Sequence, residues 1–547
     1  MVSAVLFITF FVLLVLNVPI AVCLGLSSAA AILYSGTSLT IVATNIYSGI
    51  SKFLLLAIPF FVLSGNIMAK AGISTRLIRF VDTCVGHRKG GIANVCIIVA
   101  CFFGAISGSG PATVAALGAV LIPAMVERGG FSAAFSTALM ATSSSIAIVI
   151  PPSIAFVVYA SITGVSIGDM FMAGIIPGIL MGLALVVVVM LEVRRNHVVP
   201  SNVEKASAKE RWNAFKDAFW GFLMPIIILG GIYGGFFTPT EAAAVSVVYG
   251  LFVGMVIYKE VKFKDLWEIL IDSAKTTGGI MLIVACASLF SFVCTRFGIS
   301  TAASELLARV AGNQFTFLLI CNIIFLIAGC FIDANSAMYI FIPIMLPVCK
   351  ALGYNVIAFG IMATVNLAIG QVTPPVGVNL FVAIGVKLRD GIRVTLQEIS
   401  RAVVPMVAAS IAVLLIITYI PQISTCLPAA LGSAAAIEND ETVGGDSGTT
   451  QTDNDDFNTI GDYSDLDWAD MTWNFTCSTT ETSTWAQAGR KFGELMEQAT
   501  GGKVKVDVYA ADQLTGGNQS EGIQALMNGD PVQISMHSNL IYSAFDP

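Results

Sequence analysis

The sequence predicts an all-α polytopic membrane protein with inverted repeats and two helical hairpins, followed by a disordered acidic linker and a partial α/β (βαβαβ) fragment. Composition, long charge-free stretches and an internal repeat predict this class. Of the 547 residues, 56% are hydrophobic and 12% are charged, whereas soluble domains carry about 25% charged residues. This balance argues against a soluble fold.

Charged residues are absent from ten long runs that cover most of the first 437 residues. These runs are 1–51, 91–126, 129–168, 170–191, 218–240, 242–258, 276–295, 310–332, 351–386 and 402–437. A stretch of about 20 apolar residues crosses the hydrocarbon core as a helix. Several runs are long enough for two crossings or a re-entrant hairpin, so we expect about ten to twelve spans.

The net charge of −7 arises in the C-terminal part of the chain. Residues 438–470 hold eleven acidic residues among Gly, Ser, Thr and Asn. Such a segment cannot bury enough apolar surface to offset its ordering entropy, so we predict disorder there. The expected domains are a membrane domain (1–425), an acidic linker (426–470) and a small α/β piece (471–547).

Basic residues gather in four loops, at 70–89, 194–216, 259–275 and 387–401. The positive-inside rule places all four loops in the cytoplasm. The apolar segment 402–420 then carries the chain across the membrane, so we expect the linker and the C-terminal tail on the extracytoplasmic side. The N-terminus lacks a basic leader, which favours a retained first helix over a cleaved signal.

The membrane domain contains an internal repeat, with copies at approximately 1–195 and 218–425. Five short matches occur in the same order at offsets of 220–226 residues. They are Pro19 with Pro239, Gly-Ile-Ser-Thr at 72–75 with 298–301, Pro123 with Pro347, Ala-Thr at 141–142 with 363–364, and Pro-Pro at 151–152 with 374–375. Five matches in order are hard to attribute to biased composition.

Charge around the repeated Gly-Ile-Ser-Thr run indicates that the copies are inverted. In the first copy the loop before the run (35–52) has one basic residue, and the loop after it is strongly basic. In the second copy the preceding loop is basic, whereas 298–313 holds only Arg309, balanced by Glu305. Inverted repeats are typical of secondary transporters that alternate access to a site at the membrane midplane.

Helix-breaking residues stand at matching places in the two copies. Glycine permits unusual backbone, proline removes a donor, and Ser, Thr and Asn supply neutral oxygens that suit a sodium ion. Broken helices in transporters turn such groups toward ions and substrate. The candidate sodium- and substrate-binding residues are Ser107, Gly108, Ser109, Thr113, Ser144, Ser145 and Pro151 in the first copy, and Gly329, Asp333, Asn335, Asn366, Gly370, Thr373, Pro374 and Asn379 in the second.

Structural alternatives exist for these residues. Small residues allow close helix packing, and a serine hydroxyl can bond to its own helix. Asp333 interrupts a long charge-free stretch, and an ionisable residue at that depth predicts a functional role. Glu241 follows Thr-Pro-Thr at 238–240, where an acidic residue at a helix N-terminus has a favourable structural role.

Other function classes find little support. No GxxxxGK[ST] phosphate loop is present, which argues against an ATP-driven pump. The three histidines lie at 87, 197 and 537, outside the apolar runs, so an enzyme with a nucleophile–base pair in the membrane is not expected. No basic face for nucleic acid occurs. A channel or a membrane-tethered solute sensor remains as the alternative to a carrier.

Five stretches resemble the large membrane subunit of the tripartite ATP-independent periplasmic (TRAP) transporters, and the resemblance covers residues 1–425. They are GAISGSGPATVAALGAVLIPAM, ATSSSIAIVIPPS, GGFFTPTEAAAVSVVYGL, GCFIDANSAMYIFIPIMLP and NLAIGQVTPPVGVNLFV. The resemblance implies sodium-coupled, elevator-type import of organic acid anions of the dicarboxylate or sugar-acid class in a bacterial inner membrane. It also implies a separate small membrane subunit, and no cofactor beyond coupling sodium ions.

The tail is similar to the start of the TRAP extracytoplasmic solute receptor. Strands are expected at 472–478, 503–509 and 532–537, and helices at 485–499 and 519–528, an order that demands a parallel sheet. These elements are only the opening of a two-lobed receptor. We therefore expect an incomplete receptor lobe at 471–547.

Overall fold

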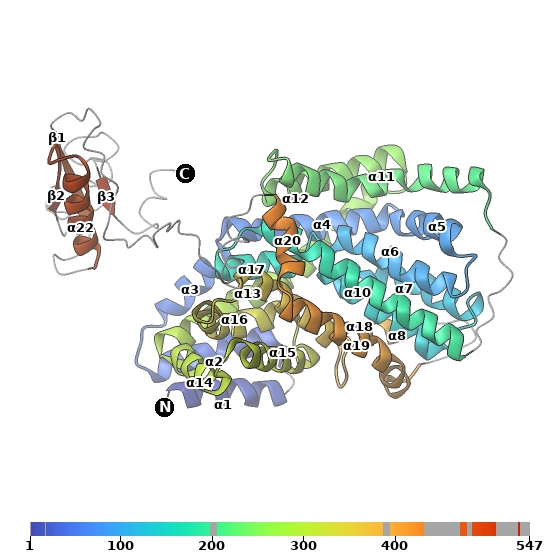
Figure 1. Cartoon of the computed structure of the whole chain (residues 1–547), viewed down its shortest axis with the longest axis horizontal. Coiled ribbons are helices and arrows are strands. Elements are labelled where there is room, and N and C mark those ends of the chain that lie inside the picture. The colour runs from blue at the N-terminus through green and yellow to red at the C-terminus, as the bar shows by residue number, and fades with distance from the viewer. Residues whose placement is uncertain are drawn as a thin grey trace, which may run out of the picture. The chain divides into compact units, whose positions relative to one another are not determined.

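Apolar stretches bounded by glycine, proline and cap residues form the helices of the chain (Figure 1). The computed structural model describes residues 2–16, 18–196, 205–386, 394–431, 471–477, 484–509 and 534–536. The chain divides into two units, residues 1–444 and 445–547, which are described separately. The predicted acidic linker, 426–470, lies outside the described residues from 432 onward.

The helices of the first unit follow the two predicted copies. The first copy contains α1 (Val2–Val15), α2 (Ile20–Tyr34), α3 (Thr40–Ile50), η1 (Phe53–Leu56), α4 (Ala57–Lys70), α5 (Ile73–Val85), α6 (Gly91–Ser107), α7 (Gly110–Glu127), α8 (Ala133–Ser145), η2 (Ile146–Ile148), α9 (Ile154–Thr163) and α10 (Ile167–Arg195). The second contains α11 (Ala208–Tyr233), α12 (Pro239–Phe252), η3 (Val253–Ile257), α13 (Phe263–Arg296), α14 (Ile299–Ala311), α15 (Gln314–Phe331), α16 (Ala334–Ala351), α17 (Val356–Gly370), α18 (Val378–Ile384) and α19 (Leu396–Tyr419), and α20 (Gln422–Ala430) follows.

Nine helices within the described residues are long and apolar enough to cross a membrane. Six further apolar helices have only 10–17 residues, among them α6, α8 and α17. We expected about ten to twelve spans because charge-free runs were counted by length. The breaks inside these runs divide them into shorter pieces, and the number of spans among these shorter helices stays a prediction.

The copies match element by element. Helices α5 and α14 each have 13 residues and each follows a glycine in the left-handed region, Gly72 and Gly298, both with φ of 68°. Helices α7 and α16 each have 18 residues. Figure 1 shows α5 and α14 at opposite ends of the first unit. The predicted inverted repeat is confirmed.

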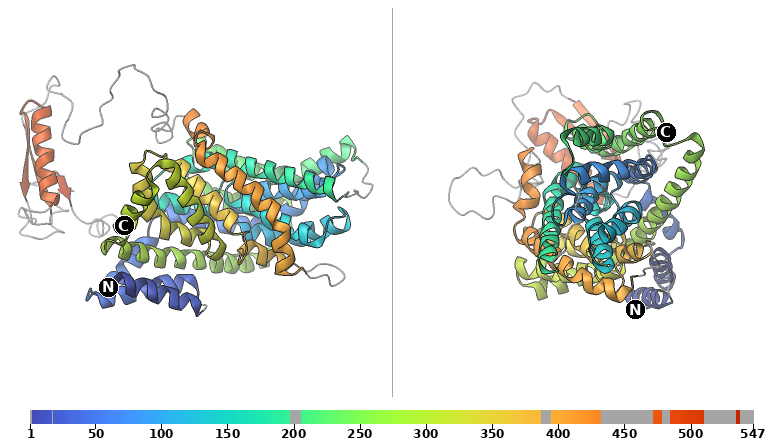
Figure 2. Two further views of the ribbon diagram at one scale, coloured as in Figure 1. Left: turned by 60° about the horizontal axis from the view of Figure 1, so that its bottom comes forward. Right: turned by 90° about the vertical axis from the view of Figure 1, so that its right-hand side faces the viewer.

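Contacts between the copies occur in matching pairs, as expected for two copies related by a two-fold axis. Helix α9 packs against α16, and its counterpart α18 packs against α7. Helix α4 packs against α12, and α13 packs against α2. The right-hand view of Figure 2 shows the helices of both copies gathered into one bundle.

The centre of this bundle is formed by α8 and α17. Every residue from Phe135 to Ser145 in α8 is buried, and so is every residue from Ile357 to Gly370 in α17. A helix that is covered on all sides belongs to the core. Both helices lead directly into a Pro-Pro segment, so the core positions these segments.

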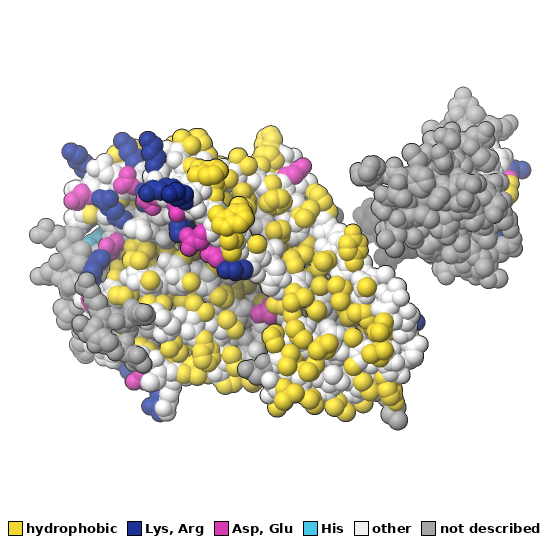
Figure 3. Space-filling view, turned by 180° about the vertical axis from the view of Figure 1, so that it is seen from behind, with side chains coloured by type: hydrophobic (Ala, Val, Ile, Leu, Met, Phe, Trp, Pro, Cys, Tyr) yellow, Lys and Arg dark blue, Asp and Glu magenta, His cyan; other side chains and the backbone are white. Residues whose placement is uncertain are grey.

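Basic residues gather at one end of the first unit (Figure 3). Ion pairs join three of the four predicted basic loops there. Lys70 pairs with Glu268 at 3.0 Å, Arg76 with Glu260 at 2.5 Å, and Arg79 with Asp217 at 3.5 Å. These contacts place the three loops on one face of the protein.

Glu241 has the structural role expected for it. Its carboxylate accepts a hydrogen bond from the Thr238 backbone N–H at 2.8 Å, while the Glu241 N–H donates to the Thr238 hydroxyl at 3.3 Å. This reciprocal pair is a capping box that satisfies free donors at the start of α12.

The second unit contains a parallel sheet, as predicted. Its elements are β1 (Met471–Cys477), α22 (Thr484–Ala499), β2 (Val504–Tyr509) and β3 (Ile534–Met536), with strand order β2-β1-β3. Phe475 of β1 lies opposite Val508 of β2. The ring of Phe475 lies against Gly489 of α22, where a Cβ would come within 2.7 Å of it. The predicted helix at 519–528 lies outside the described residues.

Candidate functional site

The first copy breaks between α6 and α7. Gly108 has a φ of +60° and Ser109 is extended, so the chain turns before α7 begins. A Cβ at Gly108 would lie 2.5 Å from the Pro152 carbonyl oxygen. Only glycine fits both the left-handed backbone and this close approach. The Ser107 and Thr113 hydroxyls lie 3.0 Å apart across the break.

The second copy breaks at the equivalent place, between α15 and α16. Ile332 is extended, and Asp333 is the N-cap of α16. The Asp333 carboxylate accepts hydrogen bonds from the Asn335 N–H at 3.0 Å, the Ser336 N–H at 3.2 Å and the Ser336 hydroxyl at 2.5 Å. The charge of Asp333 is therefore used at a helix N-terminus. A direct role in cargo binding stays a prediction.

Each break packs against the Pro-Pro segment of its own copy. A Cβ at Gly104 would lie 2.6 Å from the Cα of Ala147, and one at Gly329 would lie 3.0 Å from the Cα of Gly370. The Pro151–Pro152 and Pro374–Pro375 peptide bonds are both cis. Gly108 thereby lies against Pro152 of the first segment, and Gly329 lies against Gly370.

The two copies meet at Asn379 and Gly110. Asn379 lies on α18, and a Cβ at Gly110, the first residue of α7, would lie 2.7 Å from its Nδ2 and 3.1 Å from its Oδ1. Asn379 is fully buried, and neither atom of its amide has a hydrogen-bond partner within the described part of the chain. Within the described residues no side-chain hydrogen bond caps α7, in contrast to α16. An unpartnered amide thus faces an uncapped helix N-terminus.

Other side-chain amides of the second copy also have a buried oxygen that lacks a partner among the described residues. Asn335 and Asn366 each have an unpartnered Oδ1, and Gln371 has an unpartnered Oε1. The Asn366 Nδ2 donates at 2.8 Å to the Asn322 backbone carbonyl and to its side-chain oxygen. A buried polar atom without a partner costs about 1–3 kcal/mol, so these oxygens are candidates to bind a ligand or an ion.

Three of the predicted hydroxyl residues are bonded to their own helices. Ser144 donates to the Ala141 carbonyl at 2.6 Å, Ser145 to the Thr142 carbonyl at 2.7 Å, and Thr373 to the Ile369 carbonyl at 2.8 Å. These bonds use the hydroxyl protons within the helix, as the structural alternative predicts. The hydroxyl oxygens can still accept a further hydrogen bond or contact an ion.

Sequence reasoning omitted Gln371 and Asn322 from the candidate residues. Gln371 stands between Gly370 and Thr373 in a motif that was otherwise selected. Asn322 is a buried amide in the middle of the apolar helix α15, and this position is the signal that would have identified it.

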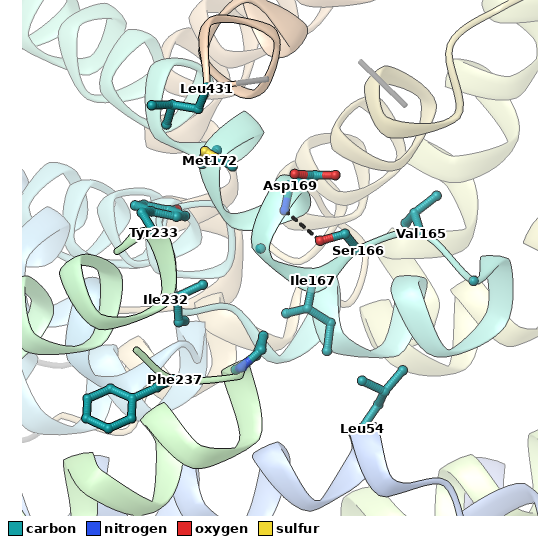
Figure 4. Close-up of a pocket in the computed structure, with 13 residues that line it drawn as sticks. Leu54, Val165, Ser166, Ile167, Asp169, Met172, Ile232, Tyr233, Phe237 and Leu431 are labelled. Carbon is teal, nitrogen blue, oxygen red and sulfur yellow. Dashed lines mark hydrogen bonds between the residues drawn. The ribbon is translucent and has the colours of Figure 1, made fainter. Parts of the chain in front are cut away.

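An open cavity lies elsewhere in the first unit. Figure 4 shows a cavity of about 530 Å³ where the start of α10 meets the end of α11. Its lining includes Leu54, Ser166, Asp169, Tyr233, Phe237 and Leu431. The Asp169 N–H donates to the Ser166 hydroxyl at 3.3 Å, which caps α10. None of the predicted site residues lines this cavity.

Family comparisons agree with the two units. Residues 7–423 match the family described as "Tripartite ATP-independent periplasmic transporter, DctM component". Residues 475–547 match "Bacterial extracellular solute-binding protein, family 7".

Several relatives and one solved structure are similar to the chain. The C4-dicarboxylate TRAP transporter large permease protein DctM of Rhodobacter capsulatus is 38% identical over 77% of this chain and 97% of that protein. The isethionate TRAP transporter permease protein DctMQ of Oleidesulfovibrio alaskensis is 40% identical over 77% of this chain, which spans 65% of that relative. The crystal structure of the Alcanivorax borkumensis YdaH transporter has the same fold, with a TM-score of 0.51, 15% identity, and coverage of 72% of this chain and 88% of that one.

Further relatives are named for other solutes. They are the 2,3-diketo-L-gulonate TRAP transporter large permease protein YiaN of Escherichia coli, at 35% identity over 74% of this chain and 95% of that protein, and the sialic acid protein SiaM of Vibrio cholerae, at 34% over 73% and 92%. The family comprises transporter permeases and not enzymes. The helix breaks, the inverted repeat and these matches together show that the chain belongs to the DctM large-permease family of TRAP transporters and carries a segment of a family-7 solute-binding protein.

Proposed function

We propose that the chain imports organic acid anions by sodium-coupled, elevator-type transport. The observation that carries this proposal is the meeting of the two copies at Asn379 and Gly110. The buried Asn379 amide has no hydrogen-bond partner among the described residues, and it faces the uncapped start of α7.

The start of α7 suits the anion. The first N–H groups of a helix and the positive end of its dipole attract carboxylate or sulfonate oxygens. Pro111 lacks an N–H, so Gly110 and Ala112 supply the nearest backbone donors, and the Asn379 Nδ2 adds a side-chain donor. The named solutes of the relatives share an acidic group, which supports an organic anion as the substrate class.

The unpartnered oxygens suit the sodium ion. Asn335, Asn366, Gln371 and Asn379 each offer a neutral amide oxygen, and all four belong to the second copy. Oxygen ligands without thiolate or imidazole fit a hard cation. Because one Asn379 amide carries both a donor and an acceptor, it can contact the anion through Nδ2 and the ion through Oδ1. The two ligands would then stabilise each other's binding.

The assembly follows from the same proposal. A small TRAP membrane subunit would complete the permease, and an extracytoplasmic solute receptor, either the fused tail or a separate chain, would deliver the solute. The basic end of the first unit would face the cytoplasm of a bacterial inner membrane, with the tail outside.

Uptake into proteoliposomes tests the function. The full chain is reconstituted with a solute-loaded receptor, and radiolabelled succinate, isethionate and a sugar acid are compared under an inward sodium gradient, an equal potassium gradient, and ATP without a gradient. Only the sodium gradient should drive accumulation. Equal uptake in sodium and potassium would indicate the channel alternative, and solute-dependent receptor docking without uptake would indicate the sensor.

A further inference from the structure

The long helix α13 contains two adjacent glycines that packing does not explain. A Cβ at Gly278 or at Gly279 would meet no atom of the described residues within 4 Å, and both residues are exposed. Each glycine disfavours a helix interior about fivefold relative to alanine, which is about 1 kcal/mol at 1.4 kcal/mol per factor of ten. The pair therefore weakens α13 at its midpoint.

The equivalent segment of the first copy is broken. When Gly72 is aligned with Gly298, Ser51 and Lys52 fall on Thr277 and Gly278. Helix α3 ends before Ser51, and Lys52 is extended, with φ of −76° and ψ of 126°, before η1 begins. One copy is thus interrupted at the position where the other runs straight through a glycine pair.

A side chain holds the break in the first copy. The Lys52 Nζ donates a hydrogen bond at 2.6 Å to the Ser161 carbonyl, near the end of α9. Gly278 has no side chain for such a bond. The break is therefore tied to the short helix that follows the Pro151–Pro152 segment.

Helix α13 is held on both sides of the glycine pair. On the N-terminal side the Asn66 amide donates to the Ser273 hydroxyl at 2.8 Å. On the C-terminal side a Cβ at Gly49 would lie 2.6 Å from the Ser288 Oγ, so α3 packs closely there. The two halves have separate attachments, and the glycine pair between them has open space.

We propose that Thr277–Gly279 is a hinge of α13. The proposal rests on the proposed carrier function. In a carrier built from two inverted copies, the state that opens to the opposite side is reached when each copy adopts the conformation of the other. In that state α13 breaks at the hinge, and α3, η1 and α4 join into one continuous helix. The Lys52–Ser161 bond is lost when they join.

Alanine substitutions test the hinge through transport. Gly278→Ala combined with Gly279→Ala should favour the straight helix roughly 25-fold. Succinate, isethionate or sugar-acid uptake, whichever the wild type supports, should fall tenfold or more while the amount of inserted protein is unchanged. Gly230→Ala is the control, since Gly230 is an exposed glycine in the last turn of α11 and a Cβ there also meets no described atom within 4 Å. Uptake by the double variant at the control's rate overturns the hinge.

A distance measurement tests the hinge without transport. Spin labels are placed at Trp267→Cys and Leu282→Cys in the full chain, with the exposed Cys426 changed to serine. A straight helix separates the two positions by about 22 Å. A shorter second population should appear as sodium is varied and should be absent from the double alanine variant. A single distance near 22 Å under every condition overturns the hinge, whereas a bend in a protein that shows no sodium-driven uptake overturns only the carrier function.

Discussion

The side-chain amide of Asn379 lies against the backbone of Gly110, so a residue of the second copy covers the first turn of a helix in the first copy. At this contact the helix break of the first copy meets a buried side chain of the second copy. A substitution of either residue should therefore reduce the transport rate more than it reduces the stability of the fold.

Gly110→Ala should abolish or strongly reduce uptake. The added Cβ would lie 2.7 Å from the Asn379 Nδ2, so the amide must move out of the proposed anion position. Gly182→Ala is a suitable control, because its Cβ would make ordinary contact, at 3.4 Å, with the Cys101 Sγ. Uptake and detergent-solubilised yield are measured for both variants. Equal uptake would show that the amide position does not matter.

Asn379→Ala should remove sodium stabilisation without destabilising the fold. The substitution deletes two buried atoms that lack partners among the described residues, so the relief of about 1–3 kcal/mol of desolvation cost offsets the small cavity that is left. A bound ion stabilises the native state by mass action, by about 2.7 kcal/mol at 100 times its Kd.

Thermal unfolding in detergent, with sodium exchanged for potassium, measures this effect. The wild type should show a higher Tm in sodium, and Asn379→Ala should show the same Tm in both salts. A sodium-dependent rise that survives in the variant would remove Asn379 from the proposed ion site.

Asp333 should tolerate an amide but not a methyl group. Asp333→Asn keeps an oxygen that accepts from the Asn335 and Ser336 N–H groups, whereas Asp333→Ala removes the cap at a cost of about 1 kcal/mol. Uptake and Tm should both be nearer the wild-type values in Asp333→Asn. Equal loss of uptake in the two variants, with Tm unchanged, would mean that the negative charge itself acts on the cargo.

Most of the architecture could be predicted from the sequence. Helix breaks at glycine and proline, and the length of an apolar helix, depend on residues that are neighbours in the sequence. Glycine and proline marked the helix breaks at Gly108 and at both Pro-Pro segments, and paired offsets identified the repeat. A charge-free run does not reveal where a helix is interrupted, so the short apolar helices α6, α8 and α17 could not be told from full spans in the sequence.

The partners of the candidate site residues could not be predicted, since they depend on packing between distant segments. Asp333 was selected for its charge, yet its carboxylate caps α16 through Asn335 and Ser336. Gln371 stands in the same Gly-Gln-Val-Thr-Pro-Pro motif as Gly370 and Thr373, and only the packing shows that its Oε1 lacks a partner among the described residues. No periodic pattern in the sequence indicates that Asn379 reaches Gly110.

Thr75 and Thr301 give the sharpest test of the inverted topology. They are equivalent residues in the first turns of α5 and α14, and both are exposed. Because α5 and α14 lie at opposite ends of the first unit (Figure 1), a cysteine at Thr75 should react with a membrane-impermeant maleimide only from the cytoplasmic side, and one at Thr301 only from outside. Cys426 is exposed and must first be changed to serine.

A cysteine at Gly444 should also react from outside, since the proposed function requires the tail to meet the solute there. Reaction of Thr75→Cys and Thr301→Cys from the same side would contradict the inverted repeat, and reaction of Gly444→Cys from the cytoplasm would exclude the tail as the receptor that delivers the solute.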